Sequence, residues 1–193
     1  MKRNKFLLIS CISLLMSAFV SCTYEKYADA DYPETTIYQP LAYNAIWNIN
    51  SQTAGNPFEI TPGTPKKYEL DKLNNKFIVF LGVVQAGIEL KTFDVDITID
   101  HSIVNTMIAD NRLPIGTLPL PESEYSLPSS IKMDPSSASA AFQMEINLNT
   151  LTGANAGRKY AVAVKIFSSS VAVNRELDTV VICIDTDFIQ NLL

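Results

Sequence analysis

Residues 93–100 read FDVDITID, and this stretch decides the fold class. Apolar side chains fill the odd positions from Phe93 to Ile99, and acidic or hydroxyl side chains fill the even positions. A period of two residues is that of a β-strand with one face in a core and the other in water. The stretch therefore predicts a half-buried strand, and segments of the same kind lie on both sides of it.

Further strands are predicted where short apolar or alternating segments are bounded by turn residues. These segments cover residues 37–49, 68–70, 77–81, 131–133, 138–148, 159–168 and 179–185. Two of them, 77–81 and 179–185, are apolar on both faces, which is typical of strands in the middle of a sheet.

The period changes once, just after the stretch at 93–100. Asp100 or Ser102 can cap a short helix that runs to about Asp110, with Asn111 as its stop. Pro-rich connections, such as residues 113–130, join the remaining segments. About seven or eight short strands and one short helix predict an all-β, immunoglobulin-like β-sandwich, although they do not fix the strand order.

The N-terminus predicts export. A basic start with three Lys or Arg residues precedes an apolar run over residues 6–20, which ends in Phe19-Val20-Ser21-Cys22. This ending resembles the bacterial lipobox, which implies that residues 1–21 are a lipoprotein signal peptide and that Cys22 is acylated. Several acyl chains give a stable membrane anchor. An ordinary secretory signal with an incidental cysteine is the alternative.

Residues 22–35 are polar and acidic and are predicted to form a flexible tether. The acidic patch of Glu25, Asp29 and Asp31 resembles the surface-export signal of lipoproteins in bacteria with Sus-type glycan-uptake systems. It predicts an outer-membrane protein, lipid-anchored and facing the cell exterior. The periplasmic face stays open as an alternative.

Composition limits the remaining possibilities. The full chain of 193 residues has 15 Lys and Arg and 20 Asp and Glu. Without the three cations of the signal peptide the net charge is about −8, which excludes the basic stripe of a nucleic-acid-binding protein. Residues 36–193 have the length of a single domain. Cys183, the cysteine left after Cys11 leaves and Cys22 is acylated, is expected to be buried and inert.

Several motifs resemble the immunoglobulin-like N-terminal domain of unknown function found in Sus-type surface lipoproteins. They are LGVVQAG at 81–87, VDITID at 95–100, LPESEYSLP at 120–128, FQMEINL at 142–148 and the segment 164–174. Such domains precede glycan-binding, lectin-like or chitinase-like domains. The resemblance implies a setting, polysaccharide capture at the cell surface, rather than an activity.

The titratable residues offer little chemistry. Asp94, Asp96 and Asp100 alternate along one strand and are weak candidates for Ca²⁺ binding or for a glycosidase pair. We interpret them as the solvated face of a strand, and we predict no metal site and no cofactor. His101, the single histidine, is interpreted as structural, and no triad with a positioned base is present in the sequence.

Aromatic residues are candidates for contact with sugar rings. Trp47 and Tyr43 share the apolar face of the strand predicted at 37–49 and are expected in the core. Tyr38 faces the other way and is the candidate glycan contact, whereas Tyr125 is expected to hold its Pro-rich loop in place.

The sequence thus predicts a non-enzymatic surface lipoprotein module, a spacer or accessory in glycan capture, with or without weak carbohydrate binding. Its expected partners are the membrane, through the N-terminal lipid, and polysaccharide or other glycan-uptake lipoproteins, but not nucleic acid. The alternative is a fimbrial or adhesin-type subunit that polymerises by strand exchange. Such subunits are usually cleaved after an arginine near the N-terminus, and the first arginine after Cys22 is Arg112, inside the domain.

Protease added to intact cells will digest the mature protein if the domain faces the exterior, while a periplasmic control protein stays uncut. Blotting for the mature chain measures the digestion. Protection in intact cells but not in lysed ones would contradict surface display and place the domain in the periplasm.

Overall fold

The computed structural model describes residues 34–50 and 67–193. The predicted signal peptide, Cys22, most of the tether at 22–35 and nearly all of the loop at 51–67 lie outside the described residues. The acylation of Cys22 and the predicted domain boundaries therefore stay predictions. Residues Glu34–Leu193 group into one unit.

The described residues contain twelve strands, two α-helices and four 3₁₀ helices. The strands are β1 (Thr36–Tyr38), β2 (Ile46–Ile49), β3 (Tyr68–Asp71), β4 (Lys76–Ala86), β5 (Phe93–Ile99), β6 (Thr117–Pro119), β7 (Tyr125–Ser126), β8 (Ser130–Met133), β9 (Ser139–Asn147), β10 (Lys159–Phe167), β11 (Ala172–Val173) and β12 (Thr179–Asp185). The helices are α3 (His101–Ala109), α4 (Thr186–Gln190), η1 (Pro40–Asn44), η2 (Glu122–Glu124), η3 (Leu148–Leu151) and η4 (Gly153–Asn155).

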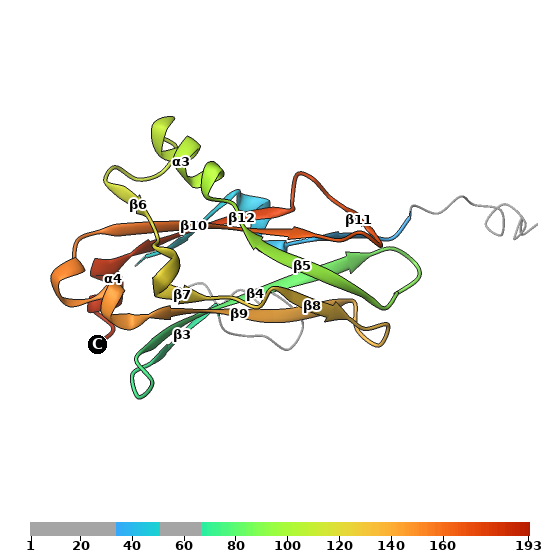
Figure 1. The fold of residues 1–193 in the computed structure, drawn as a ribbon, viewed down its shortest axis with the longest axis horizontal. Helices are drawn as coiled ribbons and strands as arrows, with labels where there is room; N and C mark the ends of the chain where they lie inside the picture. Colours follow the sequence, from blue (N-terminus) through green and yellow to red (C-terminus); the bar gives the residue numbers. More distant parts are fainter. Residues whose placement is uncertain (1–33, 51–66) are drawn as a thin grey trace, which may run out of the picture. The chain divides into compact units, whose positions relative to one another are not determined.

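These strands form two sheets that pack face to face, so the predicted all-β sandwich is confirmed (Figure 1). Sheet A has the order β11-β1-β4-β9-β7, with β3 also beside β4. Sheet B has the order β2-β12-β10-β5-β8, with β6 also beside β10. Most pairs are antiparallel, but β1 with β11, β2 with β12 and β6 with β10 are parallel.

The main core lies between the sheets, because every second side chain of each strand points toward the opposite sheet. In β4 the odd positions from Phe77 to Val83 are buried, and in β9 the even positions from Phe142 to Ile146 are buried. β5 follows the alternation predicted for it, with its three odd residues from Phe93 to Ile97 buried. Each large apolar side chain removed from water in this way stabilises the fold by about 1.5–3 kcal/mol.

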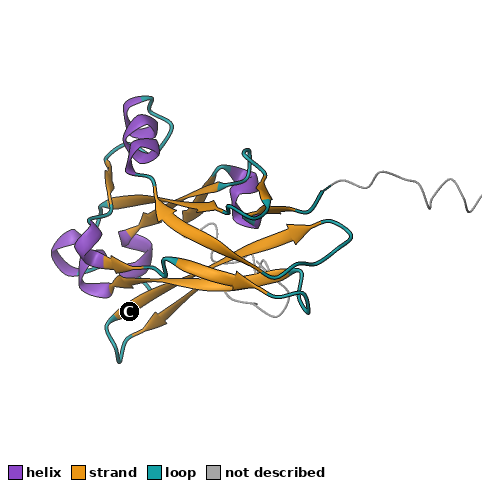
Figure 2. Ribbon diagram, turned by 45° about the vertical axis from the view of Figure 1, so that its right-hand side comes forward, coloured by secondary structure: helices purple, strands orange, loops and turns teal. Residues whose placement is uncertain are grey.

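α3 covers part of the outer face of sheet B (Figure 2). Its Val104 and Met107 pack with Ala161, Ala163 and Val181 in a second, smaller core. β10 and β12 are therefore buried on both faces along much of their length, as the sequence of β12 predicted. Within the described residues, no helix combines the length and the apolar character that a membrane crossing needs.

The prediction of one strand over residues 37–49 is wrong. Pro40 lacks a backbone N–H and opens η1, and Ala45 then adopts a φ of 56° before β2 begins. This break places β1 in sheet A and β2 in sheet B. It also turns the side chain of Tyr43 toward solvent, so that Tyr43 is 82% exposed instead of lying in the core. Trp47 is buried, as expected.

The segment 113–130 was expected to be irregular but instead contains the short regular elements β6, η2 and β7. β11 and α4 were not predicted either. Cys183 is confirmed as a free and buried thiol in β12, and burial, foremost, raises its pKa.

Phe77→Ala will lower the free energy of unfolding by about 3–5 kcal/mol, because it leaves a cavity between the sheets where Phe77 stacks on Tyr68. Chemical denaturation measures the change. Tyr43→Ala is the control, since a largely exposed side chain should change stability by no more than about 0.5 kcal/mol. A large loss in the Tyr43 variant would contradict the break at η1.

Candidate functional site

A proline ends the pairing of β7 with β9 and sends the chain from sheet A to sheet B. Ser126, the last residue of β7, pairs with Glu145, whereas β8, which begins at Ser130, pairs with β5 in sheet B. If β7 continued along β9, Pro128 would face Gln143 at a position that needs a backbone N–H. Proline has none, so the ladder stops there.

This early end leaves part of β9 without a neighbour on one side. The bonds at the two ends of the β4–β9 ladder both use even-numbered residues on the β9 side. Ala138 accepts at its carbonyl from the Gln85 N–H at 2.8 Å, and the Leu148 N–H donates to the Asn75 carbonyl at 3.0 Å. Because the N–H and C=O of one strand residue point the same way, the odd-numbered residues direct theirs away from β4. Among these, Ala141 and Gln143 pair with no strand on this side in the described ranges, although β8 comes close to β9.

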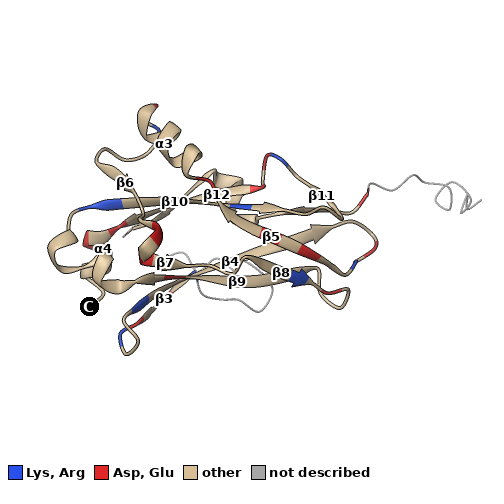
Figure 3. Cartoon of the chain, in the orientation of Figure 1, with Lys and Arg blue, Asp and Glu red and all other residues tan. Residues whose placement is uncertain are grey.

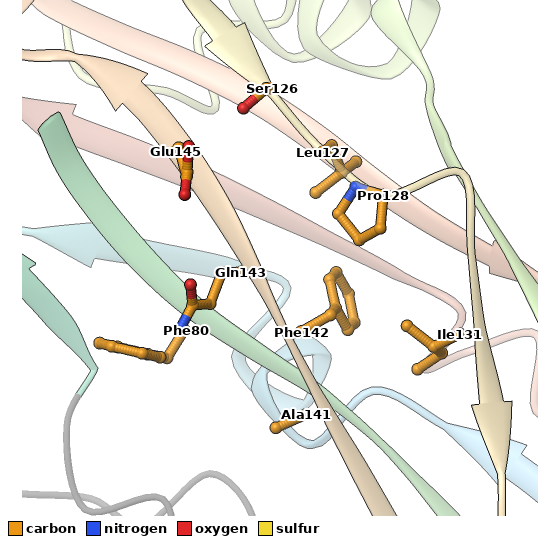
Figure 4. Close-up of a pocket in the computed structure, with 9 residues that line it drawn as sticks. All are labelled: Phe80, Ser126, Leu127, Pro128, Ile131, Ala141, Phe142, Gln143 and Glu145. Carbon is orange, nitrogen blue, oxygen red and sulfur yellow. The ribbon is translucent and has the colours of Figure 1, made fainter.

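A hollow of about 800 Å³ lies beside this open edge, and we name it the edge notch. It is lined by Phe80, Ser126, Leu127, Pro128, Ile131, Ala141, Phe142, Gln143 and Glu145. Figure 4 shows Phe142, Pro128 and Ile131 on one side of β9, with Gln143 and Glu145 on the other. The edge notch thus has an apolar wall, at the open edge between the two sheets, and polar groups on the outer face of sheet A.

A second hollow of about 340 Å³ adjoins the first, and we name it the polar hollow. Its lining consists of Asn74, Asn75, Lys76, Ser123, Glu124, Tyr125, Ser126, Glu145, Ile146 and Asn147. Ser126 and Glu145 line both hollows. The two hollows together follow the β7–β9 side of sheet A.

The amide of Asn147 organises the polar hollow. Its oxygen accepts a hydrogen bond from the side-chain nitrogen of Asn75 at 3.1 Å, and its nitrogen donates to Glu124 at 3.2 Å. The hydroxyl of Thr150 donates to the same carboxylate oxygen of Glu124. These bonds hold the polar side chains in fixed positions, while their remaining donor and acceptor sites stay available to a ligand.

The charged side chains of the polar hollow, Lys76, Glu145 and Glu124, are also held by specific partners. Lys76 Nζ lies 2.6 Å from Glu145 Oε2. The hydroxyl of Thr150, foremost, together with Ser123 and Asn147, lowers the pKa of Glu124 below its usual value. Glu124 is therefore an ionised hydrogen-bond acceptor at neutral pH.

The predicted acidic cluster of Asp94, Asp96 and Asp100 does not act as a unit. Asp94 and Asp96 are exposed on the outer face of β5, as expected. Asp100 instead caps α3, where its side chain accepts from the N–H groups of Ser102 and Ile103 at 3.1 and 3.4 Å. The described residues contain no group of three or more side chains placed to hold a metal ion.

The other predicted residues lie apart from the two hollows. His101 opens α3, and its Nε2 lies 2.8 Å from a carboxylate oxygen of Glu122. Tyr38, the predicted glycan contact, is half-buried on the outer face of sheet A, where it pairs with Val84, and it lines neither hollow. Tyr125 lines the polar hollow and also packs against the core. Lys and Arg are scattered over separate elements in the view of Figure 3.

Sequence reasoning missed most residues of both hollows. Asn75, Asn147 and Glu124 are far apart in the sequence, and the pairing of β9 with β4 on one side and β7 on the other brings them together. One signal was present in the sequence. Pro128 in a stretch of alternating residues indicated an interrupted ladder and therefore an open strand edge.

A family model described as a "-like, N-terminal domain" matches residues 49–173, which is more than half of the chain. The chain belongs to this family. The finding agrees with the resemblance to the immunoglobulin-like N-terminal domain of Sus-type surface lipoproteins. No curated protein matches the chain.

Two solved structures from Bacteroides ovatus share the fold. One is a candidate carbohydrate-binding protein, with 14% identity and a TM-score of 0.54 over 78% of this chain and 36% of that one. The other is a multidomain protein that includes the domain DUF1735, with 13% identity and a TM-score of 0.51 over 79% of this chain and 45% of that one. The chain spans less than half the length of either protein.

Asp100→Ala will lower the free energy of unfolding by about 1 kcal/mol at pH 7, because α3 loses its N-cap. The hydroxyl of Ser102, foremost, lowers the pKa of Asp100 in the folded state. The contribution of Asp100 is therefore complete above the unfolded-state pKa of about 4 and is lost as pH falls through the lower folded-state pKa.

Denaturation of both proteins between pH 7 and pH 2 measures this difference. Asp100→Asn is the control, because asparagine caps a helix as well as aspartate and does not titrate. A difference between wild type and Asp100→Ala that stays constant down to pH 2 would contradict a role for the ionised cap.

Proposed function

We propose that the protein is a non-enzymatic accessory module of glycan capture at the bacterial cell surface, and that it contacts glycans through the polar hollow. The observation that carries the proposal is the fixed set of amide, carboxylate and ammonium groups around this hollow. The resemblance to the N-terminal domain of Sus-type surface lipoproteins suggests the setting, and the match of the family model over residues 49–173 supports that resemblance.

The groups of the polar hollow suit the hydroxyls of a sugar. Each hydroxyl donates one hydrogen bond and accepts up to two. The side chain of Asn75 offers both kinds of partner, and that of Asn147, whose oxygen already accepts from Asn75 and from the Asn149 N–H, offers its remaining N–H. Glu124 accepts only, and Lys76 donates only. Tyr125 adds an aromatic surface of the kind that suits the C–H face of a sugar ring. The hydrogen bonds within the hollow reduce the ordering cost of binding, since these side chains are already in place.

Binding fits the hollow better than hydrolysis. A glycosidase needs a carboxylic acid that keeps its proton near neutral pH, which requires a raised pKa. The pKa of Glu124 is instead lowered by its three donors. Glu145, the other carboxylate of the hollow, is engaged with Lys76.

The similar structures support the same setting. One of the B. ovatus proteins with this fold is described as a candidate carbohydrate-binding protein. For location we rely on the sequence. We propose that residues 1–21 are removed and that acylated Cys22 anchors the protein to the outer membrane, with the domain facing outward beside other glycan-uptake lipoproteins.

The chain without residues 1–22 will be retained on at least one polysaccharide of a panel of host and plant glycans in affinity electrophoresis. Lys76→Ala will raise the dissociation constant about tenfold or more, since a hydrogen bond to a charged group contributes about 1.5–3 kcal/mol. Retention as a function of polysaccharide concentration gives the constants.

Lys165→Ala is the matched control. Its side chain is 40% exposed and paired with Asp178, compared with 42% for Lys76 paired with Glu145. Lys165 lies in sheet B, outside the hollow, so its loss should leave retention unchanged. Absence of retention on every glycan would leave only a spacer role, and equal losses in the two variants would remove the polar hollow as the contact site.

A further inference from the structure

Among residues 34–50 and 67–193, the edge of β9 is protected at both ends and open in the middle. At one end, Ser139 N–H donates to Ser137 Oγ at 3.2 Å, and that hydroxyl donates to the Ser139 carbonyl at 2.8 Å. At the other end, Glu145 pairs with Ser126 of β7. The backbone N–H and C=O groups of Ala141 and Gln143 lie between these ends.

The open groups form half of a β-ladder. Residues two apart on a strand are about 7 Å apart, and each offers one donor and one acceptor to the same side. An unpaired row of this kind is a template for another strand, and native proteins usually cover it. In this protein Ser137 and β7 cover its ends, and the edge notch lies beside its middle.

The wall of the edge notch is apolar where an added strand would direct a side chain inward. Phe142 lies between Ala141 and Gln143 and points toward the core, with Leu127 and Ile131 also lining the notch. A residue opposite Phe142 on an added strand would share its face of the sheet. Its two neighbours would point to the outer face, beside the side chains of Ala141 and Gln143.

We propose that the edge notch binds one extended peptide segment of a partner protein, which adds to β9 as a short strand of about three to five residues. The segment carries an apolar β-branched or leucine side chain opposite Phe142, between two polar residues. Main-chain hydrogen bonds to Ala141 and Gln143 hold it, and the apolar side chain fixes its register. This inference does not rest on glycan binding.

The geometry favours a peptide over a second copy of the chain. Antiparallel pairing of two notches around a two-fold axis through Phe142 would bring Ser139 of one copy opposite Glu145 of the other. Ser126 of β7 already occupies that position. An axis through Ala141 meets the same strand, since residue 137 would then face Glu145. A single extended segment avoids β7.

The probe is a pentapeptide, acetyl-Thr-Thr-Val-Thr-Thr-amide, added at millimolar concentration to the ¹⁵N-labelled chain without residues 1–22. We expect the amide signals of Ala141 and Gln143 to move the most, because each N–H gains a carbonyl partner. Methylation of the peptide nitrogens at positions 2 and 4 removes the donors that face β9, and should weaken binding at least tenfold. Methylation at position 3 is the control, since that N–H points away.

Ala141→Pro removes one outward N–H, which an edge strand tolerates, and should abolish the shifts. Ala141→Thr keeps the N–H and should retain them. If the proline variant fails to fold, the comparison of the methylated peptides in the wild-type protein decides the question.

Three results would overturn the proposal. The first is equal binding of both methylated peptides. The second is movement of the same two amides on addition of oligosaccharides but not of the peptide, which would make a glycan the occupant. The third is a concentration-dependent dimer that moves them without peptide, which would make the occupant a second copy.

Discussion

The antiparallel ladder between β4 and β9 is the constraint on which the rest of the structure depends. It joins nine residue pairs, from Lys76 with Asn147 to Val84 with Ser139. Because side chains alternate along both strands, this one register decides which residues enter the core and which face outward. The same register places Lys76 near Glu145 and Asn75 near Asn147. A shift of β9 by one residue would turn Met144 outward, bring polar Gln143 or Glu145 to the core face, and separate the pairs that line both hollows.

The two hollows exist because the other side of β9 is paired over two residues only. Pro128 lacks the N–H that a longer β7 would need, and the chain leaves for sheet B, where Ser130 pairs with Asp96. The crossing closes one end of the sandwich and also leaves a strand edge open. A residue that limits pairing thus shapes a surface where another molecule can bind, and no loop insertion is needed.

The sequence predicted the strands whose alternation reports burial directly, and it failed where a local break changed the partner. The half-buried pattern of Phe93 to Ile99 and a helix cap at Asp100 or Ser102 needed no tertiary information, and the structure shows that Asp100 is the cap. The strand expected at 37–49 failed because Pro40 and Ala45 turn the chain between sheets, which the period of the side chains does not reveal. β7 and β11, at two residues each, are too short to show any period.

The candidate site was less predictable than the fold for a physical reason. Amides and carboxylates such as Asn147 and Glu124 have ordinary surface roles in the sequence, and only the ladder brings them into one network. The aromatic residues gave the opposite kind of error, because a residue predicted to contact glycans lies outside both hollows. Tyr38 was favoured as a glycan contact because its side chain faces away from the core. Every second side chain of a strand does so, however, and an outward side chain does not by itself line a hollow. A contact site needs several fixed groups around one space.

Glu145 connects the two hollows through different parts of one residue. Its backbone pairs with Ser126 and closes one end of the open edge, while its side chain pairs with Lys76 in the polar hollow. Anything that draws β7 away from β9 would open the edge further, and it would also draw Glu124, which directly precedes β7, away from Asn147 and Thr150. A ligand in either hollow that holds Ser126 and Glu145 together would stabilise the arrangement that the other proposed ligand needs. By linkage, the coupling of the two binding free energies is the same in both directions.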